Sequence, residues 1–134
     1  MNMGERYTFG KTERLKKRDD VKSLFGQGSS FNVFPIKVFW RLAAEPGLQA
    51  GVGVSAALFK RSTNRNRIKR LMREGYRLQK NELQDIVAKT GKGLHLFFIY
   101  RGNELPEFQT VFEKIGSALS RLKNEIDAQT KQDN

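Results

Sequence analysis

The sequence predicts an α/β fold, built as an α+β sandwich in which helices pack on a sheet. Some segments alternate apolar and polar residues, as strands do, and others repeat apolar residues every three or four positions, as helices do. Their order along the chain is helix, strands, helix, strand and helix, which fits neither a bundle nor a barrel. The 134 residues suffice for one core, so we expect a single domain over residues 1–126 and a disordered tail over residues 127–134.

The first half of the chain is expected to contain one helix and two strands. Apolar side chains at near-helical spacing predict a helix over residues 12–28. Residues 36–42 alternate strictly, so the apolar even positions face the core, while Lys37 and Phe39 lie on the opposite face. A turn follows, and residues 48–59 are expected to form a second strand.

The second half is expected to contain two helices and one strand. A long amphipathic helix is predicted over residues 60–80, and a loop over residues 89–93. The apolar run at residues 94–102, bounded by glycines, is typical of a central strand that is covered on both faces. Residues 106–126 begin with a proline and repeat apolar residues at helical spacing, which predicts a closing helix packed on the sheet.

The helix over residues 60–80 combines an apolar side with a strongly basic one. From Lys60 to Arg73 there are seven basic side chains and no acidic one. At about 100° per residue, the basic side chains as far as Lys80 gather on the arc opposite the apolar one. Surface helices usually mix both signs of charge, so a merely solvated face is the less favoured interpretation. We expect an external anion, and arginine suits phosphate because its guanidinium group can bind it in a bidentate way.

Composition narrows the function classes further. The formal net charge of +11 favours a polyanionic partner, either nucleic acid or an anionic membrane surface. The absence of cysteine excludes disulfides and cysteine-based sites. His95 lies in an apolar strand without a nucleophile or second histidine, and Asp19 and Asp20 lie among basic residues, so we expect no catalytic residue and no metal site. No apolar run could span a membrane and the start lacks a signal-peptide core, so we expect a cytoplasmic protein.

One run of residues in the basic helix resembles a known family. Residues 65–71, RNRIKRL, followed by Arg73, are similar to the signature of the bacterial ribonuclease P protein subunit. The resemblance covers roughly residues 8–123. It includes three further segments, residues 12–30, 51–55 and 94–102.

The resemblance implies a fold and a function. The implied fold has a central mixed sheet of about four strands, the element order α-β-β-β-α-β-α, and a left-handed βαβ crossover. The implied protein is a subunit of an endoribonuclease, inactive alone, that helps a catalytic RNA remove the 5′ leader of precursor transfer RNA. That RNA and the substrate would hold the Mg²⁺ ions, and neither a membrane nor an obligate protein partner is expected. A structural RNA-binding protein of ribosomal type is the alternative.

The resemblance also implies two sets of binding residues. Lys37 and Phe39, with Phe25 from the first helix, would line a cleft that holds the leader, and the alternation of residues 36–42 had already put two of these three on one non-core face. Ala56 and Ala57 replace a basic pair that is common in the family, which implies either weaker leader or RNA affinity or compensation by Lys60 and Arg61. The side chains expected to face the catalytic RNA are Lys60, Arg61, Arg65, Asn66, Arg67, Lys69, Arg70 and Arg73.

Overall fold

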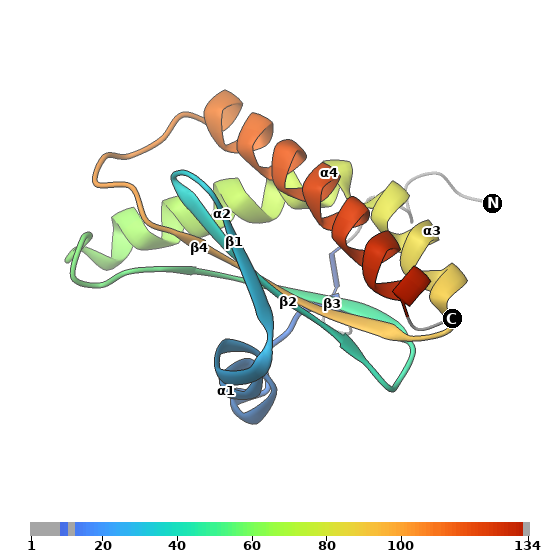
Figure 1. Cartoon of the computed structure of the whole chain (residues 1–134). Helices are drawn as coiled ribbons and strands as arrows, with labels where there is room; N and C mark the ends of the chain where they lie inside the picture. The colour runs from blue at the N-terminus through green and yellow to red at the C-terminus, as the bar shows by residue number, and fades with distance from the viewer. Residues whose placement is uncertain (1–8, 11–12, 133–134) are drawn as a thin grey trace.

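The fold is a mixed four-stranded sheet with one helix on one face and three helices on the other (Figure 1). It was obtained as a computed structural model that describes residues 9–10 and 13–132. The predicted α/β class and central mixed sheet are confirmed. In chain order the elements are α1 (Arg18–Gln27), β1 (Ser29–Val33), β2 (Ile36–Ala43), β3 (Gly47–Val54), α2 (Ser62–Gln79), α3 (Asn81–Thr90), β4 (Gly93–Tyr100) and α4 (Phe108–Gln132).

The strands lie in the order β1-β2-β4-β3. The β1–β2 and β2–β4 pairs are antiparallel, whereas β3 and β4 run parallel, so the chain crosses over through α2 and α3 between them. The alternation predicted for β2 is confirmed, because Val38 and Trp40 are buried and pair with the equally buried Phe98 and Leu96 of β4. The last strand in sequence is therefore central in space, as predicted.

Helices α2 and α4 cover the core face of the sheet. Ile68 and Met72 of α2 are completely buried, as is Ile115 of α4. A Cβ atom added to Gly75 would lie 3.6 Å from the Cα atom of Phe112, so the glycine allows the two helix backbones to approach closely. Each large apolar side chain buried in this layer contributes about 1.5–3 kcal/mol to folding, which is what fixes the orientation of α2.

The first helix begins later than predicted. It was expected to include residues 12–28, but it starts at Arg18. Leu15 instead lies in an extended segment, where its N–H donates a hydrogen bond to the carbonyl oxygen of Ala50 at 2.9 Å. The open edge of β3 offers backbone partners and a buried position for the leucine side chain, and both outweigh the weak helical periodicity of this segment.

Two other boundaries and one helix differ from the predictions. The strand expected over residues 48–59 ends at Val54, because the chain then turns and the N–H of Phe59 bonds to the carbonyl oxygen of Ser55. The helix α3 was not predicted, although Leu83 and Val87 form its buried side at a spacing of four residues. The predicted disordered tail is wrong for residues 127–132, which continue α4, since no proline or glycine interrupts them and good helix formers follow the buried Ile126.

Within the part of the chain that the structure describes, the helices are all too short or too polar to cross a membrane.

Candidate nucleic-acid interface

The face of the sheet turned away from α2 and α4 carries a row of apolar and aromatic side chains. Strand pairing aligns Phe39 of β2 and Gly51 of β3 on either side of Phe97 in β4. On the same face, two residues away along each strand, Lys37 of β2 pairs with Ile99 of β4. These positions are half-buried, so the expectation that residues 94–102 are covered on both faces is wrong for the alternate positions of β4.

Two glycines of β3 make room for the central ring of this row. A Cβ atom added to Gly51 would lie 2.6 Å from the ring of Phe97, and one added to Gly53 would lie 3.0 Å from it. Real Cβ atoms essentially never approach another atom as closely as 2.6 Å, and 3.0 Å is tighter than nine in ten real Cβ contacts. The Phe97 ring therefore lies over β3 because this strand has no side chain at the contact.

Helix α1 adds a third ring to the row. The ring centroid of Phe25 lies 4.8 Å from that of Phe39 and 5.2 Å from that of Phe97, and 41% of the Phe25 side chain is exposed. The Nζ atom of Lys37 lies 5.0 Å from the centroid of the Phe39 ring. The structure thus brings together all three residues that were expected to bind the leader.

The orientation of α1 on the sheet has identifiable supports. Leu24, on the same helix, is almost completely buried. The Nη1 atom of Arg41 on β2 donates hydrogen bonds to Ser23 at 2.7 Å and to Gln27 at 3.1 Å. The helix therefore presents Phe25 to the sheet from a position held by both apolar packing and polar contacts.

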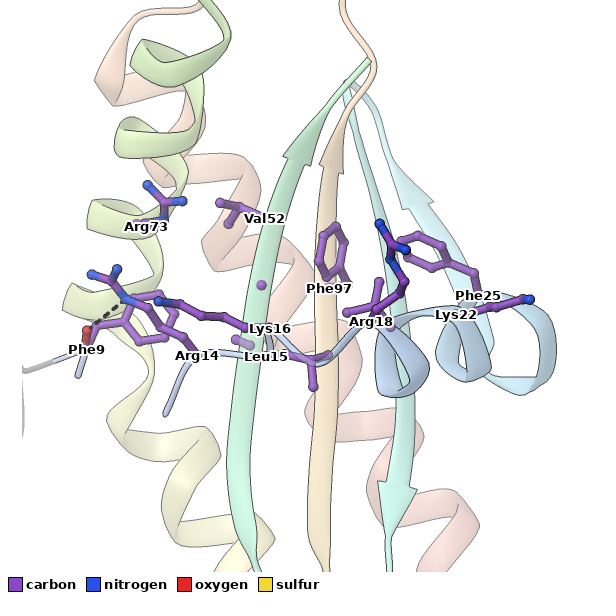
Figure 2. A pocket seen from close by; sticks show the side chains of 13 residues that line it. Phe9, Arg14, Leu15, Lys16, Arg18, Lys22, Phe25, Val52, Arg73 and Phe97 are labelled. Carbon is purple, nitrogen blue, oxygen red and sulfur yellow. Dashed lines mark hydrogen bonds between the residues drawn. The ribbon is translucent and has the colours of Figure 1, made fainter. Parts of the chain in front are cut away.

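The cleft between α1 and the sheet consists of two adjoining hollows that share Phe25 and Phe97. The larger hollow has a volume of about 630 Å³. Figure 2 shows Arg14, Lys16 and Arg73 on its β3 side and Arg18 and Lys22 on its α1 side. The smaller hollow, of about 420 Å³, is lined by Lys37 and Arg101 among other residues. Aromatic rings flanked by cations are the arrangement that accepts bases and phosphates of a single strand.

Arg73 lines the larger hollow of this cleft, and it follows Lys69 by four residues on the same side of α2. Partial burial and the positive charge of Arg14 lower the pKa of Arg73 from its ordinary value. Two guanidinium groups that disfavour each other's charge gain stability when an anion lies between them. Arg73 was expected to face the catalytic RNA, and the structure places it among the residues that line the larger hollow.

The remaining basic side chains of α2 and the preceding turn form a second surface. Asn66, Arg67 and Arg70 are exposed on α2, and Lys60 and Arg61 are exposed just before the helix. Together with the half-buried Lys69, they form what we call the outer basic face. Six polar or cationic groups on one helix end and its entry turn are an electrostatic footprint suited to phosphates.

Arg65 has an internal role besides any external one. Its Nη1 atom donates hydrogen bonds to the backbone oxygens of Phe59 at 2.7 Å and of Lys60 at 2.8 Å. It thereby ties the turn after β3 to the first turn of α2, which places Lys60 and Arg61 beside the helix.

The helical-wheel prediction is wrong for Lys80. It was expected on the basic arc, but only 1% of it is exposed, and its ammonium group pairs with Glu13. The N-terminal segment passes over this end of α2, so a position that faces solvent in an isolated helix is covered in the folded chain. Arg77, one turn earlier, is partly compensated by Glu74, with 3.1 Å between Nε and Oε2.

Sequence reasoning missed several residues of the cleft, among them Phe97, Arg101 and Arg14. Phe97 and Arg101 alternate with the buried positions of β4, so a period-two pattern was present, but the high apolarity of the run concealed it. Arg14 reaches the cleft only because of the extended path of the N-terminal segment, for which the sequence carries no local signal. Among the described residues, His, Cys, Asp and Glu side chains do not gather in groups of three that could hold a metal ion.

Comparisons with known proteins agree with this fold. The family model "Ribonuclease P" matches residues 9–123. The ribonuclease P protein component of Porphyromonas gingivalis strain W83 is 37% identical over 124 residues, which cover 89% of this chain and 90% of that protein. The ribonuclease P protein of Thermotoga maritima has a similar structure, with a TM-score of 0.63, 29% identity, and coverage of 81% of this chain and 96% of that one. The Staphylococcus aureus protein, at 19% identity and a TM-score of 0.64 over 84% of this chain and 97% of that one, shares the fold.

Proposed function

This chain belongs to the ribonuclease P protein family, and from that premise we propose that it is the protein subunit of a ribonuclease P. It binds the catalytic RNA and the 5′ leader of precursor transfer RNA, and so assists the cut that produces the mature 5′ end. The observation that carries this proposal is the presence of two different RNA-suited surfaces in one small domain. They are the aromatic and cationic cleft and the outer basic face of α2.

The cleft is the proposed site of the leader. A leader is single-stranded, so its bases can stack on aromatic rings and its phosphates can contact lysine and arginine. Phe25, Phe39 and Phe97 offer three rings within 5.2 Å of a neighbour, and Lys37 stands beside one of them. None of these contacts reads a base edge, which suits a protein that must accept leaders of many sequences.

The outer basic face is the proposed site of the catalytic RNA. A folded RNA presents phosphates along its helices and junctions, and exposed arginines can bind them in a bidentate way. Arg67, Lys69 and Arg70 lie within one turn of a helix whose apolar side is fixed in the core. The helix can therefore hold these groups at constant spacing while the RNA binds.

In this proposal the protein carries no catalytic side chain. The catalytic RNA supplies the chemistry with Mg²⁺ held by RNA and substrate. The contribution of this chain is positional: it holds the leader in the cleft and the RNA on the outer basic face, so the scissile bond spends more time at the RNA active centre. Purified protein alone is expected not to cut precursor transfer RNA.

The experiment that tests the proposal is single-turnover cleavage of precursor transfer RNA at low Mg²⁺, catalysed by the same organism's ribonuclease P RNA with and without this protein. A large gain in rate that grows with leader length supports the proposal. Tight RNA binding without any gain would move the assignment to a structural RNA-binding protein of ribosomal type.

A second arm separates the two surfaces. Phe39→Ala should abolish the dependence of the gain on leader length while the affinity for the catalytic RNA stays unchanged. Lys89→Ala, which removes an exposed charge from α3 on the opposite face of the sheet, serves as the control. If Phe39→Ala leaves the leader-length dependence intact, the leader does not bind in this cleft.

A further inference from the structure

The N-terminal segment forms one wall of the cleft. We call residues 9–10 and 13–16 the strap. The strap runs along the outer edge of β3, where Arg14 forms a single parallel bridge with Ala50 and the N–H of Leu15 donates to the Ala50 carbonyl oxygen. The side chain of Leu15, which belongs to the strap, is buried. The strap therefore closes the side of the larger hollow that would otherwise end at the edge of the sheet.

A buried ion pair fastens the strap to α2. The ammonium group of Lys80 pairs with the Oε1 atom of Glu13, while the Oε2 atom of Glu13 accepts a hydrogen bond from the N–H of Gly10 at 2.9 Å. The ring of Phe9 packs on Tyr76 with 5.3 Å between centroids, and the Lys80 Nζ atom lies 5.9 Å from the Phe9 centroid. We call this Glu13–Lys80 pair the latch. Lys80 is almost completely buried, so loss of this pair would cost folding free energy, and the pair therefore holds the strap on α2.

The latch determines where Arg14 lies. The Arg14 Nε atom donates to the carbonyl oxygen of Phe9 at 3.2 Å, and its guanidinium carbon lies 5.3 Å from the centre of the Phe9 ring. In Figure 2 the Arg14 guanidinium group lies beside the Phe9 ring and near Arg73, at the α2 side of the larger hollow that both arginines line.

The charge around this hollow is one-sided. Five of its lining side chains are cationic, and none of the described residues that line it is acidic. Glu13 is adjacent to Arg14 in sequence, yet its two oxygens contact Lys80 and Gly10. The latch thus directs the Glu13 carboxylate toward Lys80, and Arg14 and Arg73 line a hollow that has no acidic side chain among the described residues.

We propose that Arg14 and Arg73 together bind a backbone phosphate of single-stranded RNA in the larger hollow, and that the Glu13–Lys80 latch positions Arg14 for this contact. The inference rests on the proposed function, because it names a phosphate site within the leader cleft. The ligand is a phosphodiester of a single strand, because Phe25 and Phe97 at the other side of the same hollow offer rings for the adjacent base. Arg14 and Arg73 are contact residues, and Glu13 and Lys80 are positioning residues.

The test for the contact residues pairs protein variants with neutralised phosphates. Precursor transfer RNAs that each carry one methylphosphonate in the leader are bound to the holoenzyme made with wild-type protein, Arg14→Gln or Arg73→Gln. On unmodified substrate each variant is expected to weaken binding about tenfold, as expected for one lost charge-assisted contact. At one leader position, the methylphosphonate should weaken substrate binding by the wild-type holoenzyme by the same factor. At that position it should not change substrate binding by the holoenzyme made with either variant.

The control and the contradicting result are equally specific. Lys89→Gln, an exposed charge on α3, should bind every substrate as the wild type does. If Arg14→Gln and Arg73→Gln weaken binding equally at every methylphosphonate position, or weaken a leaderless transfer RNA as much, they do not share a leader phosphate and the proposal is wrong.

The positioning role of the latch needs a variant that folds. Glu13→Gln alone removes the carboxylate that pairs with the buried Lys80. The test therefore uses the double variant Glu13→Gln with Lys80→Met, which removes both charges and retains an unbranched apolar stem. Thermal unfolding shows whether the double variant is folded. It should weaken binding of the leader substrate to the same extent as Arg14→Gln, and adding Arg14→Gln to it should have little further effect.

The outcomes separate this inference from the proposed function. If wild-type protein gives no leader-dependent gain at all, the proposed function fails before any variant is compared. If wild-type protein gives the gain, and the folded double variant retains full leader affinity while Arg14→Gln loses it, the latch does not position Arg14.

Discussion

At the scale of single residues, Phe97 shows how a side chain in a central strand can become part of a binding surface. It is only half-buried although its neighbours on β4, Leu96 and Phe98, are completely buried. The alternation of β4 places the ring on the cleft face, and Gly51 with Gly53 supplies the space that the ring needs. The shape of the cleft floor therefore depends on two residues that have no side chain.

Adding one methyl group at Gly51 should disturb both stability and the cleft. The new Cβ atom would lie 2.6 Å from the Phe97 ring and 3.0 Å from the backbone oxygen of Leu15, so the ring must move and the strap cannot yield easily. We expect Gly51→Ala to cost about 1–3 kcal/mol in the free energy of unfolding and to weaken leader binding. Urea denaturation and leader-dependent binding to the holoenzyme measure the two effects.

Two further glycines provide matched controls for this prediction. Gly53→Ala should have a smaller effect, because its Cβ atom would lie 3.0 Å from the ring edge and meets no backbone atom. Gly26→Ala in α1 meets nothing within 4 Å and should stabilise the protein by about 0.5–1 kcal/mol. Equal losses for Gly51→Ala and Gly53→Ala would contradict the role assigned to the close contact at Gly51.

Tyr76 should make the protein sensitive to alkaline pH. Burial, followed by the nearby charge of Glu13, raises the pKa of Tyr76 far above its ordinary value of 10.0. Folding therefore favours the neutral phenol, and this contribution is complete below about pH 10 and declines above it, where the unfolded chain ionises first. The free energy of unfolding should fall by up to about 1.4 kcal/mol per pH unit above pH 10, and less steeply in Tyr76→Phe.

Chemical denaturation of both proteins between about pH 8 and pH 11 measures this difference in slope. Burial also raises the pKa of Tyr100, with a smaller contribution from Glu104, so some decline should remain in Tyr76→Phe. Identical slopes in the two proteins would show that Tyr76 ionises in the folded state as it does in the unfolded chain.

At the scale of elements, α2 joins the two proposed surfaces. Its apolar side is buried against α4 and the sheet, Arg67 and Arg70 are exposed on the outside, and Arg73 reaches the cleft. A helix of 18 residues holds these groups at fixed relative positions. Binding on one surface therefore places the other surface at a defined distance from the RNA.

Arg70→Ala should weaken binding to the catalytic RNA and leave leader binding unaffected. Arg70 is exposed and lies outside both hollows of the cleft, so its loss removes one phosphate contact and little else. Each such contact contributes about 0.7–0.9 to the slope of log affinity against log salt concentration, and the slope should fall by this amount. Filter binding to the catalytic RNA over a salt series measures it.

Arg65→Ala is the informative comparison for Arg70→Ala. It also removes the hydrogen bonds to the carbonyl oxygens of Phe59 and Lys60, so thermal stability should fall as well as affinity. An Arg70→Ala protein that loses as much stability as Arg65→Ala would mean that Arg70 supports the fold.

At the scale of the whole molecule, twelve of the 25 basic side chains line the cleft or lie on the outer basic face. Nearby carboxylates pair with basic side chains of the chain itself. Glu13 pairs with Lys80, and Glu74 pairs with Arg77. The surfaces therefore retain most of their positive charge. Association with a polyanion should be both fast and strongly dependent on salt.

The affinity for the catalytic RNA should fall steeply as salt rises. About six phosphate contacts imply a slope of log affinity against log salt on the order of −4 to −5. Titrations from low to physiological ionic strength measure the slope. A flat response would contradict every RNA-binding role considered for this chain.

The sequence by itself determined the parts of this protein that follow from local periodicity. It predicted β2 and the face that carries Lys37 and Phe39, the central position of β4, and the two-sided character of α2. The family resemblance was confirmed as well. These features repeat over two to four residues, so they are visible in a linear chain.

Only the tertiary structure decided which distant residues meet. The exposure of Phe97, the convergence of Arg14 with Arg73, and the burial of Lys80 against Glu13 all depend on strand order, strand register and the path of the strap across β3. Local periodicity determines which side of its own element a residue occupies. It does not determine what another part of the chain places against that side, because that choice depends on the packing of the whole core.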